Sequence, residues 1–207
     1  MQIELKNLGK RFNRQWIFRN LDFVFQSGNA YAITGHNGSG KSTLLQIIAG
    51  SLEKTEGSIT YSLDNQTIQP EEYFSCITLS APYLELIEEF TLTEFFTFHF
   101  SLKPLLSGYS VQQVIEHIEL EDAKHKQIRH FSSGMKQRAK LGQAFFSNVP
   151  VVLLDEPTAN FDTKGIDLYM RLASAFGKDR ILVICSNDEN EIGFCSSRID
   201  ITQYKKS

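Results

Sequence analysis

The sequence has few cysteines, no long hydrophobic run and no excess of positive charge. No apolar run approaches the ~20 residues that a membrane-spanning helix needs, and residues 1–6 lack the regions of a signal peptide. We therefore expect a cytoplasmic protein, for which any membrane role depends on a partner. The net charge of −3 gives no support for nucleic-acid binding, which relies on many Lys and Arg contacts to phosphate. No nucleic-acid partner is expected.

The cysteines and histidines give no sign of a metal site. Cys76, Cys185 and Cys195 are odd in number and lack metal-type spacing, so we expect reduced, buried thiols. The histidines show no paired ligand spacing on one helix, and none is assigned to a metal. The length of 207 residues and the hydrophobic content of 42% are typical of one soluble α/β domain.

Residues 35–42 match the phosphate-binding pattern G-x-x-x-x-G-K-[ST]. The apolar run 30–34 before them suits a buried strand, and apolar residues recur at helical spacing from Leu44 until Gly50, a predicted helix C-cap. In a strand–glycine loop–helix arrangement, the backbone N–H groups of the loop and the positive end of the helix dipole point toward the same place. That place can bind phosphates. A glycine-rich turn with an accidental lysine is the alternative, and the position between strand and helix argues against it.

The residue types in this loop predict roles toward a nucleotide. Gly35, Gly38 and Gly40 allow backbone angles that are closed to other residues. We expect Lys41 to reach the β- and γ-phosphates and the Ser42 hydroxyl to ligate Mg²⁺.

A second motif supports this interpretation. The apolar strand 151–154 ends in two carboxylates, Asp155 and Glu156. In P-loop proteins the strand-terminal Asp commonly supports Mg²⁺ at the phosphates, and an adjacent Glu can act as the base that polarises the attacking water. A core strand followed by a charged turn is the alternative, and Lys41 upstream favours the functional interpretation.

Periodicity predicts the elements around these motifs. Alternation in 3–8 and 21–25 indicates an antiparallel β layer, 57–61 and 73–79 suggest further strands, and the polar segment 62–72 suggests a connection. Between 82 and 148 the spacing becomes helical, with a capping-box signature at Thr91 and Glu94. Later elements alternate: strand 151–154, helix 163–176, strand 180–184. We predict one α/β domain, 1–207: a P-loop NTPase core with an antiparallel β subdomain and a helical insertion, 82–148.

Residues 131–135, Phe-Ser-Ser-Gly-Met, resemble the signature sequence, usually Leu-Ser-Gly-Gly-Gln, of ATP-binding cassette (ABC) ATPase domains. Alone, Ser-Ser-Gly at a helix start could be an N-cap; with the other two motifs, nearly the whole chain is similar to ABC transporter ATPase subunits. The resemblance implies ATP and Mg²⁺ as ligands. It also implies a head-to-tail dimer, a homodimer or a pair with another ABC ATPase. Each ATP would lie between one P-loop and Ser132, Ser133 and Gly134 of the other protomer.

The resemblance implies further site residues. Asp162 matches the acid of the D-loop, which contacts the partner domain in this family. Phe12 aligns with the aromatic residue on which adenine stacks; Trp16 is an alternative, and either could be a core residue of the β layer. The predicted ATP-binding residues are Phe12, Gly35, His36, Asn37, Gly38, Ser39, Gly40, Lys41, Ser42 and Thr43, with Ser42 and Asp155 at the metal.

Two residues expected in this family are replaced. The glutamine that helps to bind Mg²⁺ falls at Ala81 or Ser80, and Asn187 takes the place of a histidine near the γ-phosphate. An Asn amide donates to phosphate oxygens but carries no positive charge. With Glu156, Lys41 and Asn187 as the catalytic set, we predict slow-to-moderate ATPase activity.

The leading functional hypothesis is the ATPase subunit of a membrane transporter, peripheral on the inner face of the cell membrane through a separate transmembrane permease. The phenylalanines of the helical insertion are ordinary core in one interpretation and interface anchors in another; they are Phe90, Phe95, Phe96, Phe98 and Phe100.

A second hypothesis is a nucleotide-regulated module that controls a membrane partner without rapid turnover. A third, a nucleic-acid or ribosome-associated ABC protein, is disfavoured because such proteins usually carry two ATPase units or long inserted coils.

Overall fold

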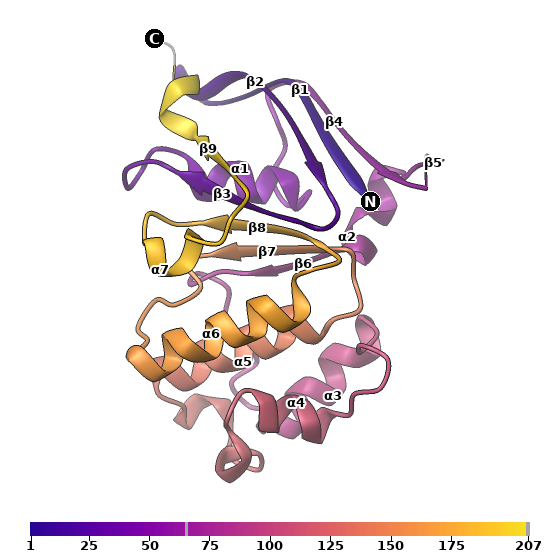
Figure 1. Cartoon of the computed structure of the whole chain (residues 1–207), viewed down its shortest axis with the longest axis vertical. Coiled ribbons are helices and arrows are strands. Elements are labelled where there is room, and N and C mark those ends of the chain that lie inside the picture. Colours follow the sequence, from indigo (N-terminus) through magenta and orange to yellow (C-terminus); the bar gives the residue numbers. More distant parts are fainter. Residues whose placement is uncertain (65, 206–207) are drawn as a thin grey trace.

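A computed structural model describes residues 1–64 and 66–205 and shows two sheets packed around helix α1 (Lys41–Ile48), with helices on the far side of the second sheet (Figure 1). Asn65, in the predicted connection 62–72, lies outside the described residues. No helix within the described ranges is long and apolar enough to cross a membrane.

The first sheet is antiparallel and has the order β2-β1-β4-β5. Its strands are β1 (Gln2–Phe12), β2 (Gln15–Gln26), β4 (Glu56–Leu63) and β5 (Gln66–Thr67). The predicted antiparallel layer is confirmed, because alternate residues such as Ile3 and Leu5 are buried on one face while Lys6 stays exposed.

The second sheet is parallel and has the order β6-β7-β8-β3-β9. Its strands are β6 (Ile77–Ser80), β7 (Val151–Asp155), β8 (Ile181–Cys185), β3 (Asn29–Thr34) and β9 (Ser197–Asp200). Because parallel strands end at the same edge of a sheet, the segments that follow β3, β6, β7 and β8 meet there, at a place where α/β folds bind ligands.

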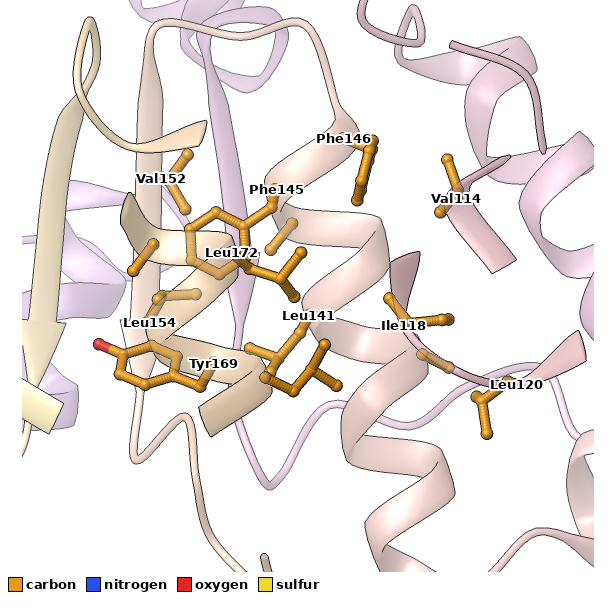
Figure 2. Packing of buried hydrophobic residues seen from close by; sticks show 14 of the residues in the cluster. Val114, Ile118, Leu120, Leu141, Phe145, Phe146, Val152, Leu154, Tyr169 and Leu172 are labelled. Carbon is orange, nitrogen blue, oxygen red and sulfur yellow. The ribbon is translucent and has the colours of Figure 1, made fainter. Parts of the chain in front are cut away.

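Strand β7 separates two hydrophobic cores. Val151 and Leu153 face α1 and the antiparallel sheet, whereas Val152 and Leu154 face α5 (Ser133–Phe146) and α6 (Thr163–Phe176). Figure 2 shows these last two side chains beside residues of both helices. Burial on both faces explains why β7 is uniformly apolar until Asp155.

The helices of the segment 82–148 begin at polar caps. Thr91 caps α3 (Leu92–Leu102) in a capping box with Glu94, as the sequence predicts. Ser110 caps α4 (Val111–His117) in the same way with Gln113. Helix α5 follows, and the aromatic side chains between these helices join the core beneath α6.

Two sequence predictions were wrong in detail. Residues 73–79 were predicted as one strand, yet α2 (Tyr73–Cys76) occupies the first half and β6 begins at Ile77. The cause is Pro70, which starts a helical turn that continues into α2, where the Tyr73 ring packs on Tyr61 at 3.9 Å between centroids. The predicted connection 62–72 contains β5. The chain after Ser186 also forms α7 (Glu189–Ile192) and β9, which no clear periodicity marks.

Histidine 99 makes the stability of the helical segment dependent on pH. Burial, reinforced by the Lys103 charge, lowers the pKa of His99 to about 4, and its Nε2 lies 2.9 Å from the Ser147 Oγ. In the unfolded chain the pKa of a histidine is near 6.5, so between pH ~6.5 and pH ~4 the unfolded chain binds a proton at this residue and the folded chain does not. The free energy of unfolding is therefore not reduced by His99 above pH ~6.5, and it falls as the pH is lowered toward ~4. Between pH 7.5 and pH 5 the free energy of unfolding should decrease in both proteins. We expect this decrease to be about 2 kcal/mol smaller in His99→Gln than in wild type. Denaturant titration at both values measures this, and an identical loss in both proteins would contradict it.

Candidate nucleotide-binding site

The P-loop lies between β3 and α1, and its glycines adopt the backbone angles that the sequence predicts. Gly35, Gly38 and Gly40 have φ values of 140°, 77° and 111°. A Cβ on Gly40 would approach Ile17 Cγ2 to 2.4 Å, and one on Gly35 would approach Ser39 Oγ to 2.6 Å. The loop therefore needs glycine for space as well as for conformation.

Lys41, the first residue of α1, is buried and folds back over the loop. Its Nζ donates a hydrogen bond to the Gly35 carbonyl at 2.7 Å. A cavity of about 240 Å³ opens above the loop and is lined by Ile17, Asn37, Gly38, Gly40, Lys41, Ser42, Thr43 and Glu156. A cation and a helix N-terminus thus face one hollow, which is the arrangement that binds phosphate.

Asp155 supplies a carboxylate at the end of β7 and is only 3% exposed. Burial raises its pKa, and a hydrogen bond from Ser42 opposes that rise. A buried carboxylate paired with a serine hydroxyl is a set of oxygen donors that Mg²⁺ accepts, and a divalent cation would compensate the burial of the charge. The residues therefore fit Mg²⁺. Outside this pair, no group of three or more His, Cys, Asp or Glu in 1–64 and 66–205 forms a candidate metal site.

Glu156 lines the same cavity in an unusual backbone conformation. Its φ is 44°, in the left-handed region that non-glycine residues seldom adopt. The Glu156 N–H donates to the Cys185 carbonyl of β8 at 3.0 Å, which holds the turn against the neighbouring strand. Strained backbone of this kind is frequent at functional sites, where the surroundings enforce it.

Asn187, which follows β8, also reaches the P-loop. Its Oδ1 accepts from the Gly35 N–H at 3.0 Å, and its Nδ2 donates to the Gly35 carbonyl at 2.8 Å. The amide therefore braces the entrance of the loop. The second N–H of the Asn187 Nδ2 is not used by Gly35 and could donate to a phosphate oxygen.

The position of the missing glutamine lies beside Asp155. Ser80 pairs in register with Leu154, so Ala81 follows β6 next to the end of β7. Ala81 is fully buried and offers no side-chain ligand. The Ser80 Oγ is buried and has no hydrogen-bond partner among the described residues.

The signature segment forms a separate hollow. Ser132 caps α5 by accepting a hydrogen bond from the Met135 N–H at 3.2 Å, so the N-cap interpretation holds for its structure. With Ser133, Gly134 and Asp162 it borders a cavity of about 500 Å³ that shares no lining residue with the P-loop cavity. One protomer therefore presents two distinct surfaces.

Phe12 lies outside both cavities. Its ring is 46% exposed, with the Lys10 ammonium 4.7 Å from the centroid. Trp16 is engaged by the guanidinium groups of Arg11 and Arg19, at 5.3 and 4.4 Å from its ring centroid. Phe12 thus keeps an open surface for stacking, whereas Trp16 is already covered.

Two further contacts were not foreseen from the sequence. Ile17 of β2 lines the P-loop cavity, and no pattern in its strand distinguishes it. Glu191 of α7 is buried and accepts from both the N–H and the Oγ1 of Thr158, while Tyr169 donates to its carbonyl at 2.8 Å. This buried carboxylate ties the segment after Glu156 to the segment after Asn187.

Comparison with known proteins identifies the family of this chain. The family model described as "ABC transporter" matches residues 18–159. The uncharacterized ABC transporter ATP-binding protein YybJ of Bacillus subtilis is 31% identical over 164 residues, 79% of this chain and 75% of that protein. The cytochrome c biogenesis ATP-binding export protein CcmA of Rhizobium etli is 30% identical over 178 residues, 84% of this chain and 82% of that protein.

Solved structures share the fold. A putative ABC transporter ATP-binding protein from Pyrococcus furiosus superposes with a TM-score of 0.85 at 19% identity, covering 100% of both chains. A dimeric ATP-binding cassette in a post-hydrolysis state, bound to ADP and Pi, has a TM-score of 0.79 at 24% identity, with coverage of 97% and 95%.

The chain belongs to the ABC transporter family, as an ATP-binding ATPase domain. ABC ATPase domains bind ATP or ADP, work as dimers and pair with transmembrane subunits.

Proposed function

We propose that this chain binds Mg²⁺-ATP at the P-loop cavity, hydrolyses it slowly to moderately, and powers a transporter through head-to-tail dimerisation. The observation that carries the proposal is the meeting of Lys41, Ser42, Asp155 and Glu156 at one edge of the parallel sheet. Cation, metal ligands and a carboxylate base are the parts that hydrolysis of a nucleotide requires.

The positions of these side chains support the following roles. Lys41 and the N–H groups of the loop hold the phosphates, and Ser42 with Asp155 holds Mg²⁺, which neutralises phosphate charge. Glu156 accepts a proton from the attacking water. The loop residues Gly35, His36, Asn37, Gly38, Ser39, Gly40 and Thr43 complete the cradle, Phe12 stacks on adenine and Asn187 orients the loop. The second cavity supports a contribution in trans from Ser132, Ser133 and Gly134, with Asp162 at the dimer contact.

The helical subdomain, 82–148, and the neighbouring helix α2 offer a surface for a permease. Phe98 and Leu102 on α3 are 44% and 65% exposed, and Phe74 on α2 is 68% exposed. Lys103 donates to the Phe74 carbonyl, so the end of α3 and α2 are neighbours. Exposed aromatic and aliphatic side chains of this kind anchor protein partners. Through a permease the chain would be peripheral on the inner face of the membrane.

Nucleotide binding tests the proposal directly. Lys41→Met removes charge-assisted hydrogen bonds to phosphate worth about 2–3 kcal/mol, so the Kd for ATP should rise roughly 30- to 150-fold. Fluorescence anisotropy of a labelled ATP measures the Kd, and Lys178→Met, at an exposed lysine after α6, is the matched control. Equal affinities for the two variants would contradict the assignment of the site.

A second candidate function is a nucleotide-regulated module that controls a membrane partner without rapid turnover. Two observations favour it: Ala81 supplies no ligand, and the Asn187 amide is engaged by Gly35. The steady-state rate of phosphate release from the purified dimer separates the two functions. ATP that stays bound and unhydrolysed over many minutes supports the regulatory module.

A further inference from the structure

The turn that follows β6 brings a tyrosine to the position that lacks a glutamine. The Leu84 N–H donates to the Ala81 carbonyl at 3.2 Å, which closes a turn with Pro82 and Tyr83 at its centre. Because Ser80 is in register with Leu154, this turn lies beside the end of β7, where Asp155 is located. Tyr83 is 47% exposed and is the first residue after β6 that carries a long polar side chain.

Lys140 of α5 holds this turn in place. Its Nζ donates to the carbonyls of Ala81 and Pro82, at 3.0 Å each. These two bonds come from the helix that begins at the signature segment, so the turn is braced from the helical side of the molecule. A turn fixed at two successive carbonyls restricts where the Tyr83 side chain can point.

Tyr83 lies near the helix that carries the predicted metal ligand, because Gln46 of α1 and Asp155 both act on its hydroxyl. Ser42 and Gln46 are four residues apart on α1, which places them on one face, about 6 Å apart along the axis. Against the effect of burial, the Ser42 side chain lowers the pKa of Asp155 and the Gln46 side chain lowers the pKa of Tyr83, so the two members of each pair lie close together. Burial raises the pKa of Tyr83, the Gln46 side chain opposes this, and the negative charge of Asp155 adds to the rise. Tyr83 therefore keeps its proton at neutral pH and lies at the same edge of the parallel sheet as Asp155.

We infer that Tyr83 supplies the side-chain contact to the magnesium–nucleotide complex that Ala81 cannot supply, with Gln46 orienting its hydroxyl and Lys140 its backbone. The inference rests on the proposed function, because it needs ATP at the P-loop. Mg²⁺ usually keeps several waters in protein sites, and a phenol oxygen can accept a hydrogen bond from such a water or donate one to a phosphate oxygen. The Tyr83 hydroxyl thus contributes to ATP affinity only when Mg²⁺ and the nucleotide are both bound.

Nucleotide affinity measured with and without Mg²⁺ tests the inference. Tyr83→Phe removes only the hydroxyl. We expect equal Kd values for labelled ATP in EDTA, and roughly a five- to tenfold weaker affinity than wild type in millimolar Mg²⁺, as the net contribution of one ordinary hydrogen bond implies. Tyr109→Phe, which removes a hydroxyl from the aromatic cluster beside Phe146 and Phe176, is the matched control.

Lys140 provides a second measurement of the same site. Lys140→Met should weaken Mg²⁺-dependent affinity in the same direction, and Lys140→Arg, which can still donate to two carbonyls, should restore most of it. If Tyr83→Phe gains as much affinity from Mg²⁺ as wild type does, the inference is overturned. If wild type binds no ATP, or Lys41→Met binds it as well as wild type does, the proposed function fails instead, so the two failures are distinguishable.

Discussion

Replacing Glu156 with Gln is expected to lower phosphate release from ATP at least ~100-fold while ATP affinity stays within about twofold. General-base catalysis contributes roughly 10²–10⁴-fold to a rate, and an amide cannot accept the proton of the attacking water. The side chain keeps its size, and the backbone at φ 44° is held by the bond to Cys185, so the fold should not change. ATP that cannot be cleaved should accumulate in closed dimers.

Phosphate release and size-exclusion chromatography in ATP together measure this effect. Glu121→Gln, at an exposed glutamate in the helical subdomain, is the control for charge removal. An unchanged rate of phosphate release in Glu156→Gln would show that Glu156 is not the base. A lower rate without dimer accumulation would support the base but contradict nucleotide-driven closure.

The parts of this site that the sequence predicts are those encoded by neighbouring residues. The P-loop needs glycines, a lysine and a serine in consecutive positions, and a parallel strand buried on both faces is visible as the run 151–154 before Asp155. Helix caps such as Thr91 with Glu94 are equally local. In each of these cases the physical requirement acts on a few adjacent residues, so the pattern survives in the linear sequence.

The parts that the sequence does not predict depend on contacts between distant residues. Glu191 and Thr158 are separated by 33 positions, and Asn187 and Gly35 by 152. Neither pair has a local signal. The boundary within 73–79 was missed because Pro70 and the packing of Tyr73 on Tyr61 outweigh the strand propensity of an apolar run. Tyr83 likewise gains its significance only from the register of β6 on β7.

Complementation between two inactive variants is the second large effect we expect. In a head-to-tail dimer each ATP needs the P-loop of one protomer and the signature segment of the other. Lys41→Met removes the first half, and Gly134→Asp places a negative charge at the second. A Cβ at Gly134 would lie 3.7 Å from the Asn160 carbonyl oxygen, which is an ordinary van der Waals contact. The Gly134→Asp variant should therefore fold. Each variant alone should retain only a few per cent of wild-type ATPase activity, or less.

Mixing the two variants in equal amounts should restore about a quarter of wild-type activity. Random pairing makes half of the dimers mixed, and each mixed dimer contains one intact site and one with both defects. The control mixes Lys41→Met with the double variant Lys41→Met/Gly134→Asp, in which no pairing gives an intact site and no activity should return. The separate cavities of the P-loop and the signature segment require this behaviour if each is half of a site. Activity that fails to return in the first mixture would contradict an ATP site built from the P-loop of one protomer and the signature segment of the other.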